Sequence, residues 1–175
     1  VSVSIAEEFG VEAGSDYDGL MTAATRWMGF DKVFDTSFSA DLTIMEEASE
    51  LVQRVTQGGA LPMFTSCSPG WIKFMEQTFP HLLPHVSTCK SPMSMLGALI
   101  KGYFAPAQGL DPKKVFSVAI MPCTAKKFEA GRPELGHNDM ADIDAVLTTR
   151  ELARLFRRRG VNFKMLKPEA PDSPF

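Results

Sequence analysis

The sequence lacks the features that mark several classes of protein. It has three cysteines in 175 residues, an odd number without close spacing, which argues against a small secreted domain held by disulfides. No apolar run is long enough to span a membrane, and the first residues do not form a secretion signal. A net charge of -3 and a pI of about 5.6 give no electrostatic reason to expect nucleic-acid binding. We therefore expect a cytoplasmic protein with no membrane segment, whose thiols are reduced or bind metal.

The hydrophobic content and the length of the chain are typical of a folded domain. Hydrophobic residues make up 45% of the chain, enough to bury a core, and the length suits one domain or a large part of one. The chain starts at Val1 in an amphipathic pattern and ends after a proline-rich stretch at residues 168–174, the one candidate linker. We expect residues 1–175 to be a segment of a longer protein.

Apolar runs and helical periodicity alternate along the chain. The pattern predicts strands over residues 32–36, 61–65, 115–121 and 143–147. It predicts helices over residues 4–9, 19–28, 39–56, 70–79, 92–104 and 148–159. Strands that alternate with helices indicate an α/β fold with a mainly parallel β-sheet flanked by helices.

Two of the predicted helices carry clear end signals. Ser39 can cap the long helix over residues 39–56, and Gly58 follows its end. The residues expected to face the core from this helix are Leu42, Met45, Leu51, Val52 and Val55. Thr148 or Thr149 can cap the last helix, which Gly160 ends.

Two short cysteine segments are the most informative feature. Residues 65–71 read Thr-Ser-Cys-Ser-Pro-Gly-Trp, and residues 121–129 read Met-Pro-Cys-Thr-Ala-Lys-Lys-Phe-Glu. Each places its cysteine, Cys67 or Cys123, just past a predicted strand, where parallel sheets bind ligands. A free cysteine is usually a buried apolar thiol. Two cysteines in matching positions, each near a proline, favour ligands of a shared soft-metal cluster instead.

Charged residues near the second cysteine suggest further chemistry. Lys126 lies three residues after Cys123, where its ammonium could reach an anionic group held near that cysteine. The alternative is a solvated lysine. Glu129 could form an ion pair with a neighbour or accept a proton.

A cluster of carboxylates lies on the predicted long helix. Glu46 and Glu50 have i,i+4 spacing and Glu47 and Glu50 have i,i+3 spacing, so they are neighbours on the helix surface. If partly buried, such carboxylates can pass on protons; the alternative is a solvated acidic face. Ser87 and Cys89 lie in a polar turn before the helix that starts at residue 92.

The two cysteine segments closely resemble the first two signature motifs of the iron-only ([FeFe]) hydrogenases. Those motifs read Thr-Ser-Cys-Cys-Pro-x-Trp and Met-Pro-Cys-x-x-Lys-x-x-Glu. The second is matched at every defined position, and the first differs only at Ser68. The resemblance extends over essentially the whole chain, including residues 38–47 and 142–152. It implies a two-lobed H-cluster domain, of which this chain is one lobe and part of the second.

The resemblance also implies an activity and a cofactor. Such enzymes reversibly combine protons and electrons into dihydrogen at an H-cluster. This cofactor joins a [4Fe–4S] cubane to a diiron subcluster with CO, cyanide and an azadithiolate bridge. Ferredoxin or a similar electron carrier and a set of maturation proteins are the implied partners.

Roles for single residues follow from the matched motifs. Cys123 is implied to be a cubane ligand, next to Pro122 in the cofactor-binding segment. Cys67 is implied to be the thiol that exchanges protons with the bridging amine, and Lys126 to bind a cyanide. The residues implied to carry protons from solvent to that thiol are Glu47, Glu50 and Ser87.

One position departs from the family pattern. Ser68 stands where the family has a second cysteine, a cubane ligand, and serine is a poor ligand for iron–sulfur clusters. Three alternatives are open: Ser68 ligates weakly, Cys67 ligates in its place, or Cys89 compensates.

A third family motif, with two further cubane cysteines, is absent because no cysteine follows Cys123. We expect the remainder of the domain to supply it beyond Phe175.

Three other functions are possible for a chain with these motifs. Eukaryotic family members serve in iron–sulfur protein assembly, which needs neither the lysine motif nor a carboxylate relay. A hydrogen-sensing variant would be expected to lack the thiol at Cys67. An α/β domain with thiols but no cluster would require both motifs to be coincidental.

Overall fold

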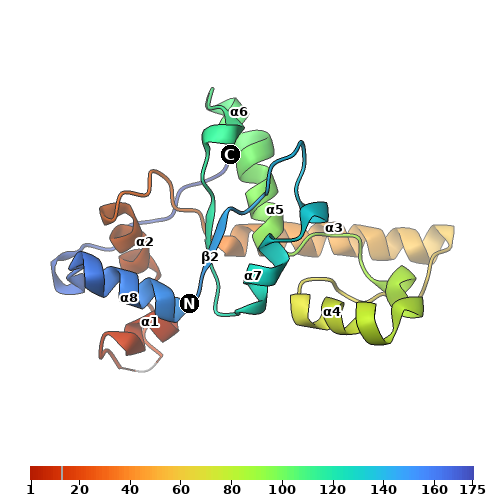
Figure 1. Cartoon of the computed structure of the whole chain (residues 1–175), viewed down its shortest axis with the longest axis horizontal. Helices are drawn as coiled ribbons and strands as arrows, with labels where there is room; N and C mark the ends of the chain where they lie inside the picture. The colour runs from red at the N-terminus through yellow and green to blue at the C-terminus, as the bar shows by residue number, and fades with distance from the viewer. Residues whose placement is uncertain (13) are drawn as a thin grey trace. The chain divides into compact units, whose positions relative to one another are not determined.

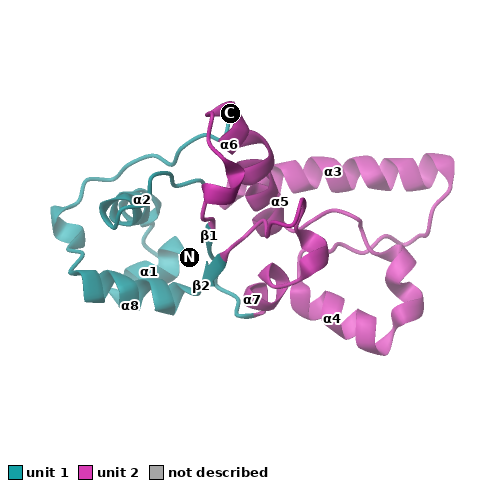
Figure 2. Ribbon diagram, turned by 45° about the horizontal axis from the view of Figure 1, so that its top comes forward, with its two compact units in different colours: residues 1–35, 118–124, 145–175 teal, residues 36–117, 125–144 magenta. Residues whose placement is uncertain are grey.

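The computed structural model describes residues 1–12 and 14–175 (Figure 1). By its internal contacts the chain forms two compact units, coloured separately in Figure 2. Unit 1 comprises Val1–Asp35, Val118–Thr124 and Ala145–Phe175; unit 2 comprises Thr36–Ser117 and Ala125–Asp144. None of the described helices is both long enough and apolar enough to cross a membrane.

Among its described residues, unit 1 contains a small parallel sheet and three α-helices. Strands β1 (Val118–Ile120) and β2 (Ala145–Leu147) pair in parallel, with Ile120 opposite Leu147 at their carboxyl ends. The helices are α1 (Ser2–Glu8), α2 (Asp18–Trp27) and α8 (Thr149–Arg159), followed by the short η5 turn (Phe163–Met165). The sheet confirms an α/β fold, and its strands are shorter than the predicted runs over residues 115–121 and 143–147.

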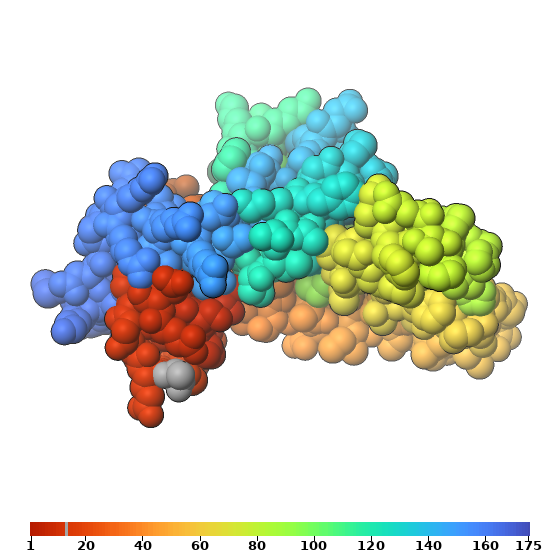
Figure 3. All heavy atoms as spheres, turned by 60° about the horizontal axis from the view of Figure 1, so that its bottom comes forward, coloured from red at the N-terminus to blue at the C-terminus, as the bar shows by residue number. Residues whose placement is uncertain are grey.

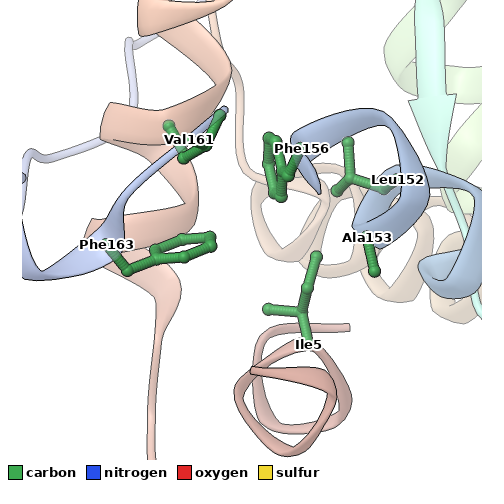
Figure 4. Packing of buried hydrophobic residues seen from close by; sticks show 7 residues of the cluster. Ile5, Leu152, Ala153, Phe156, Val161 and Phe163 are labelled. Carbon is green, nitrogen blue, oxygen red and sulfur yellow. The ribbon is translucent and has the colours of Figure 1, made fainter. Parts of the chain in front are cut away.

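The core of unit 1 is built around α8 (Figure 4). Phe156 is fully buried, and its ring meets that of Phe163 edge-on with 5.5 Å between centroids. Ile5 from α1 is also fully buried. Burying one such side chain contributes about 1.5–3 kcal/mol, so this cluster fixes α1 against α8.

The ends of α8 follow the sequence signals. Thr148 is the N-cap, and a reciprocal capping box joins it to Glu151. Gly160 closes the helix in the left-handed conformation with φ of 74°. The predicted helix over residues 148–159 is therefore confirmed, with Thr148 rather than Thr149 as the cap.

Unit 2 is helical. Its α-helices are α3 (Thr36–Gln57), α4 (Pro69–Thr78), α5 (Pro92–Leu99), α6 (Ala105–Ala107) and α7 (Ala125–Ala130). The tighter turns are η1 (Pro80–His85), η3 (Pro112–Lys114) and η4 (Pro133–Leu135). Helix α3 packs on α5, and α4 packs on α7.

The predicted helix over residues 92–104 is an α-helix only as far as Leu99. A π-helical turn, η2 (Ile100–Phe104), follows it and carries the buried Lys101. The Lys101 ammonium donates to Asp144 at 2.7 and 2.8 Å and to the Ala141 carbonyl at 2.7 Å. These bonds tie the π turn to the segment that leads into β2.

Two predicted strands are wrong. The run over residues 32–36 forms one bridge, Phe34 with Asp172, because the Asp172 carboxylate takes the Val33 N–H. The run over residues 61–65 forms one bridge, Phe64 with Val86. Pro62 has no N–H with which to extend that ladder.

The predicted linker over residues 168–174 is also wrong. Arg26 pairs with Glu169 at 2.6 Å and with Asp172 at 2.7 Å, and Lys32 pairs with Asp172 at 3.0 Å. A Cβ at Gly19 would lie 2.8 Å from the side chain of Pro168. The segment is therefore packed against the rest of unit 1.

In the long helix α3, the buried and exposed faces are the reverse of those predicted. It starts at Thr36, and Ser39 is fully buried and donates to the Thr36 carbonyl, so Ser39 is not the cap. Thr43 is buried and contacts Met95 of α5. Leu42 is partly buried, whereas the other residues expected inside are exposed: Met45, Leu51, Val52 and Val55. Figure 3 shows the surface of this helix in orange. Sequence periodicity locates an apolar face of a helix, but it does not show whether that face or another packs against the rest of the protein.

Candidate functional site

The loops that carry Cys67 and Cys89 run side by side in unit 2. Phe64 and Val86 form a parallel bridge, with the Phe64 N–H donating to the His85 carbonyl at 2.8 Å. Cys67 and Cys89 each lie three residues beyond this bridge. The Ser66 hydroxyl donates to the Cys89 carbonyl at 2.5 Å and joins the two loops.

The Cys67 loop leads directly into α4. Ser68 is the N-cap residue, with extended backbone and no side-chain cap bond, and Pro69 is the first helical residue. Cys67 is free and exposed, and Ser68 is exposed. Both side chains are therefore accessible for contact with a ligand at the start of this helix.

Lys126 of α7 is anchored at the Cys67 loop. Its Nζ donates to the Cys67 carbonyl at 2.8 Å and to Glu129 Oε2 at 2.7 Å. The side chains of Lys126 and Glu129 are only 12% and 7% exposed. The alternative of a solvated lysine is excluded by this burial.

Two serines at the start of α5, neither of which was predicted to be a site residue, hold Glu129 from its other side. The Glu129 Oε1 accepts hydrogen bonds from the hydroxyls of Ser91 and Ser94, the second at 2.7 Å. Ser91 is also the N-cap of α5. Only the Ser91-Pro92 start signal was visible in the sequence. The result is a chain of contacts from α5 through Glu129 and Lys126 to the Cys67 loop.

Glu50 of α3 is the centre of the second cluster. Its Oε2 accepts from the Ser87 hydroxyl at 2.9 Å and from the Thr88 N–H at 3.0 Å. The Cys89 Sγ lies 4.0 Å from the same oxygen. The structure thus brings together Glu50, Ser87 and Cys89 beside the Cys67 loop.

Arg54, one turn further along α3, completes this cluster. It donates to Glu50 Oε1 from Nε at 3.0 Å and from Nη2 at 2.6 Å. It also binds the carbonyls of Ala60, Pro84 and Val86. The i,i+4 spacing of Glu50 and Arg54 was a signal for this pair that the sequence analysis did not use.

The surroundings of Glu50 decide its charge. Burial raises the pKa of Glu50, but the hydrogen bonds from Arg54, from the Thr88 N–H and from Ser87 outweigh it, so the pKa lies below its usual value. Glu50 is therefore ionised at neutral pH.

The thiol of Cys89 is shifted in the other direction. Burial is the main cause that raises its pKa, and the neighbouring carboxylates, Glu50 first among them, add to this effect. A hydrogen bond with Ser87 offsets part of the rise. Cys89 is therefore a protonated thiol at neutral pH.

The other glutamates of α3 differ in burial. Glu46 is exposed, whereas Glu47 is partly buried. The Glu47 Oε1 is buried and has no hydrogen-bond partner among the described residues. A buried polar atom is expected to have a partner, so Glu47 is available to accept a hydrogen bond.

Cys123 belongs to unit 1 and follows β1. It is free and exposed, and its neighbours Pro122 and Thr124 line a cavity of about 720 Å³. The other lining residues are Ser4, Glu7, Glu8, Thr148, Thr149 and Arg150. Cys67 lies in unit 2, so the two cysteines are placed by separate units. In the part of the chain that the structure describes, no group of three or more His, Cys, Asp or Glu side chains could hold a metal ion.

Comparison with known proteins adds independent information. Residues 1–175 match the family model for the iron only hydrogenase large subunit, C-terminal domain. The chain is 49% identical over 172 residues to iron hydrogenase 1 of Clostridium pasteurianum, covering 98% of this chain and 30% of that protein. It is 50% identical over 175 residues to the periplasmic [Fe] hydrogenase large subunit of Nitratidesulfovibrio vulgaris, covering 99% and 42%.

A relative of a different kind is also similar. The cytosolic Fe-S cluster assembly factor narfl of Danio rerio is 35% identical over 179 residues, covering 98% of this chain and 43% of that protein. Among solved structures, a variant of [FeFe]-hydrogenase HydA1 from Chlamydomonas reinhardtii is 45% identical, with a TM-score of 0.94, over 99% of this chain and 44% of that one.

The chain spans less than half the length of each of these relatives. The family model nevertheless matches every residue, and the fold agrees with that of the solved hydrogenase. The chain therefore belongs to the iron-only hydrogenase family, as part of the C-terminal domain of the large subunit.

Proposed function

We propose that this chain is the part of an iron-only hydrogenase that supplies the proton path and the first ligands of the H-cluster, in a protein that reversibly forms dihydrogen. One observation carries the proposal. A carboxylate–hydroxyl–thiol cluster and a buried lysine converge on the same cysteine loop, through the Ser66 bond to Cys89 and the Lys126 bond to the Cys67 carbonyl. A thiol-bearing α/β domain without a cluster would need neither arrangement.

The residues present suit the cofactor. Cys123 is an accessible thiol for an iron–sulfur cluster, which proteins hold by cysteine thiolates. Lys126 presents a largely buried ammonium at the Cys67 loop, where it can bind an anion such as cyanide. When bound, the H-cluster supplies the iron centres at which protons and electrons combine.

The proton path is proposed to run along α3 to the Cys67 loop. Ser87 can pass its hydroxyl proton to the ionised Glu50, 2.9 Å away, while its oxygen accepts another. The unpartnered oxygen of Glu47 lies on the same helix, one turn before Glu50. The lowered pKa of Glu50 favours its ionised form, which can accept a proton from Ser87.

The position of Cys89 bears on the replacement at Ser68. The Cys89 thiol lies against Glu50 and has a raised pKa, so it is a weak thiolate donor. We assign Cys89 to the proton path and leave the ligand position to Ser68 or Cys67, both at the start of α4. Cys67 is essential in either arrangement.

The main alternative function is iron–sulfur cluster assembly, as in the name of the Danio rerio relative. An assembly factor needs neither the ionised Glu50 with its hydroxyl donor nor the buried lysine at a cysteine loop, and both are present. A hydrogen sensor would use the same site at low turnover, and the accessible thiol at Cys67 favours turnover.

The partners are proposed with the function. Electrons are expected from ferredoxin or a similar carrier, and maturation proteins are expected to deliver the cluster to the complete domain. Stepwise H-cluster assembly is revealed in the structure of HydA(deltaEFG), which is 46% identical to this chain with a TM-score of 0.94.

The decisive experiment uses the full-length protein. It is loaded with iron, sulfide and the diiron unit, and infrared spectra and hydrogen evolution from a reduced dye are recorded. CO and cyanide bands together with hydrogen evolution are the expected result. Cubane absorbance without those bands or activity would favour the assembly function.

A further inference from the structure

We propose that Asp142 is a positioning residue of the proton path. Its ion pair with Lys90 holds residues 86–91, named here the Ser87 loop. This loop carries the hydroxyl that donates to Glu50. The inference rests on the proposed function, and neither member of the ion pair was predicted to be a site residue. All of these residues belong to unit 2.

Three carboxylates from separate segments of the chain hold the Ser87 loop. Near its start, the Ser87 hydroxyl donates to Glu50 of α3 at 2.9 Å. At its end, the Ser91 hydroxyl donates to the buried Glu129 of α7. Lys90, the residue before Ser91, makes the third attachment, to a carboxylate that lies shortly before β2. The loop is therefore fixed from three directions.

The third attachment is a mostly buried ion pair. The Lys90 ammonium donates to Asp142 Oδ2 at 2.5 Å and to the Leu135 carbonyl at 2.6 Å. The side chain of Asp142 is only 3% exposed, and that of Lys90 is 30% exposed. The other carboxylate oxygen, Oδ1, lies 3.0 Å from His137 Nδ1. A buried charge requires such partners, so removing the lysine or the aspartate would leave the other member of the pair poorly compensated.

The backbone around Asp142 is itself held in place. A Cβ at Gly97 of α5 would lie 2.6 Å from the Asp142 carbonyl oxygen, so the helix approaches this peptide more closely than a side chain would allow. Two residues later, Asp144 accepts from Lys101 at 2.7 Å. The aspartate is therefore a fixed point to which the long side chain of Lys90 attaches the Ser87 loop.

The connection from Lys90 to the relay hydroxyl is short. The N–H of Cys89, the residue before Lys90, donates to Ser87 Oγ at 3.2 Å. The same hydroxyl donates to Glu50 at 2.9 Å. A displacement of Lys90 therefore moves the N–H group that orients the Ser87 oxygen. Because transfer between two groups depends steeply on their relative position, this displacement should slow the passage of protons.

Loss of the attachment should also change the charge state of Glu50. Burial raises the pKa of Glu50, and the hydrogen bonds from Arg54, from the Thr88 N–H and from Ser87 lower it. The last two donors belong to the Ser87 loop, so a displaced loop lets the pKa of Glu50 rise. The other titratable groups at Glu50, the Arg54 guanidinium and the Cys89 thiol, are not altered in the variants below. The acid limb of the pH–rate profile should therefore move to higher pH.

The test uses the full-length protein loaded with iron, sulfide and the diiron unit. Asp142→Asn keeps the size of the side chain and removes its charge. We expect hydrogen evolution from a reduced dye to fall about tenfold, below the roughly 10²-fold cost of a gross misplacement, with the acid limb at higher pH. Lys90→Met, which keeps the long side chain and removes the ammonium, should give the same shift. If Asp142→Asn does not fold, Lys90→Met takes its place.

A double variant tests whether the two residues act through one contact. Lys90→Met combined with Asp142→Asn should move the acid limb no further than either single change, because the contact can be lost only once. Asp144→Asn is the matched control. It removes the partner of Lys101 in the neighbouring ion pair, which holds the π turn and not the Ser87 loop. This control should lower stability in a urea titration and leave the acid limb in place.

The outcomes distinguish the inference from the proposed function. A loaded wild-type protein that evolves no hydrogen would overturn the proposed function, and the positioning role with it. An active wild type whose acid limb stays in place in Asp142→Asn and Lys90→Met would overturn the positioning role alone, even if both variants lost stability. Additive shifts in the double variant, or an equal shift in Asp144→Asn, would also overturn it, because they would indicate a general loosening of unit 2.

Discussion

The hydroxyl of Ser87 donates a hydrogen bond to the carboxylate of Glu50 at 2.9 Å, across 37 positions of sequence. The contact joins the loop after η1 to the middle of α3, and Arg54 holds the same carboxylate from its other side at 2.6 Å. The protein alone therefore brings together a proton donor (Ser87), an ionised acceptor (Glu50) and a cation (Arg54).

Glu50→Gln should slow hydrogen evolution by about 10²-fold or more, the scale of a lost acid–base group. Glutamine keeps the size of the side chain and one accepting oxygen, but its amide nitrogen cannot accept a hydrogen bond and the side chain cannot take up a proton. Hydrogen evolution and infrared spectra of the loaded full-length protein are the measurements, and the CO and cyanide bands should stay in place. Glu46→Gln, on the same helix but exposed, is the control and should keep full activity. Unchanged turnover in Glu50→Gln would remove this residue from the proton path.

Cys123→Ala should abolish both the cubane absorbance and hydrogen evolution, because it removes one of the few thiolate ligands of the cluster. Cys89→Ala is the comparison, since its thiol lies against Glu50 with a raised pKa. This variant should retain the cubane absorbance. Loss of the cluster in Cys89→Ala would instead make Cys89 the ligand that replaces the missing cysteine at position 68.

Arg54→Gln should change the pH dependence of turnover. Arg54 is the main group that lowers the pKa of Glu50, and burial raises that pKa once the arginine is gone. Glu50 would then be protonated over a wider acidic range, so the acid limb of the pH–rate profile should move to higher pH. The profile is measured from hydrogen evolution at constant driving force.

The same Arg54→Gln variant should also lose stability. It leaves the carbonyls of Ala60, Pro84 and Val86 without their donor, which should cost about 1–3 kcal/mol in a urea titration. A pH–rate profile that does not move, with the stability loss present, would show that Arg54 is only structural.

Asp172→Asn should destabilise the protein at pH 7 and much less near pH 2. Burial raises the pKa of Asp172, but the bonds from Arg26, from the Val33 N–H and from Lys32 together lower it from 3.8 to about 2. A carboxylate with a lowered pKa stabilises the fold above its unfolded-state pKa. That contribution disappears as the pH falls through the folded-state value.

The expected loss for Asp172→Asn at neutral pH is on the order of 2 kcal/mol from this shift. Urea titrations at pH 7 and near pH 2 provide the measurement. Glu169→Gln is the control, because that side chain is 47% exposed and its pair with Arg26 should matter less. Equal destabilisation by Asp172→Asn at both pH values would contradict the electrostatic explanation.

The elements that were predicted well are those with local signals. Helix α8 shows its start in Thr148 and Glu151 and its end in Gly160, all within a few residues. The i,i+3 spacing of Glu47 and Glu50 likewise placed both on α3 before any contact was known. Such signals require no knowledge of the rest of the chain.

The features that were missed depend on distant contacts. The bridge of Phe64 with Val86 and the serine pair around Glu129 join segments more than 20 residues apart. The outward face of α3 was missed because its polar residues Ser39 and Thr43 pack inside. An apolar face predicted from the sequence can pack against another surface, but the sequence does not show that this chain supplies that surface.

The bridge between Phe64 and Val86 links the mobility of the two loops that follow it. The same bridge and the Ser66 bond to Cys89 restrain both the loop of Cys67 and the loop of the proton path. Because the two loops share these contacts, we expect that immobilising one loop also reduces the conformational entropy of the other. We expect a molecule that binds at Cys67 therefore to restrict the loop of Ser87 as well, which would link its binding to the alignment of Ser87 with Glu50.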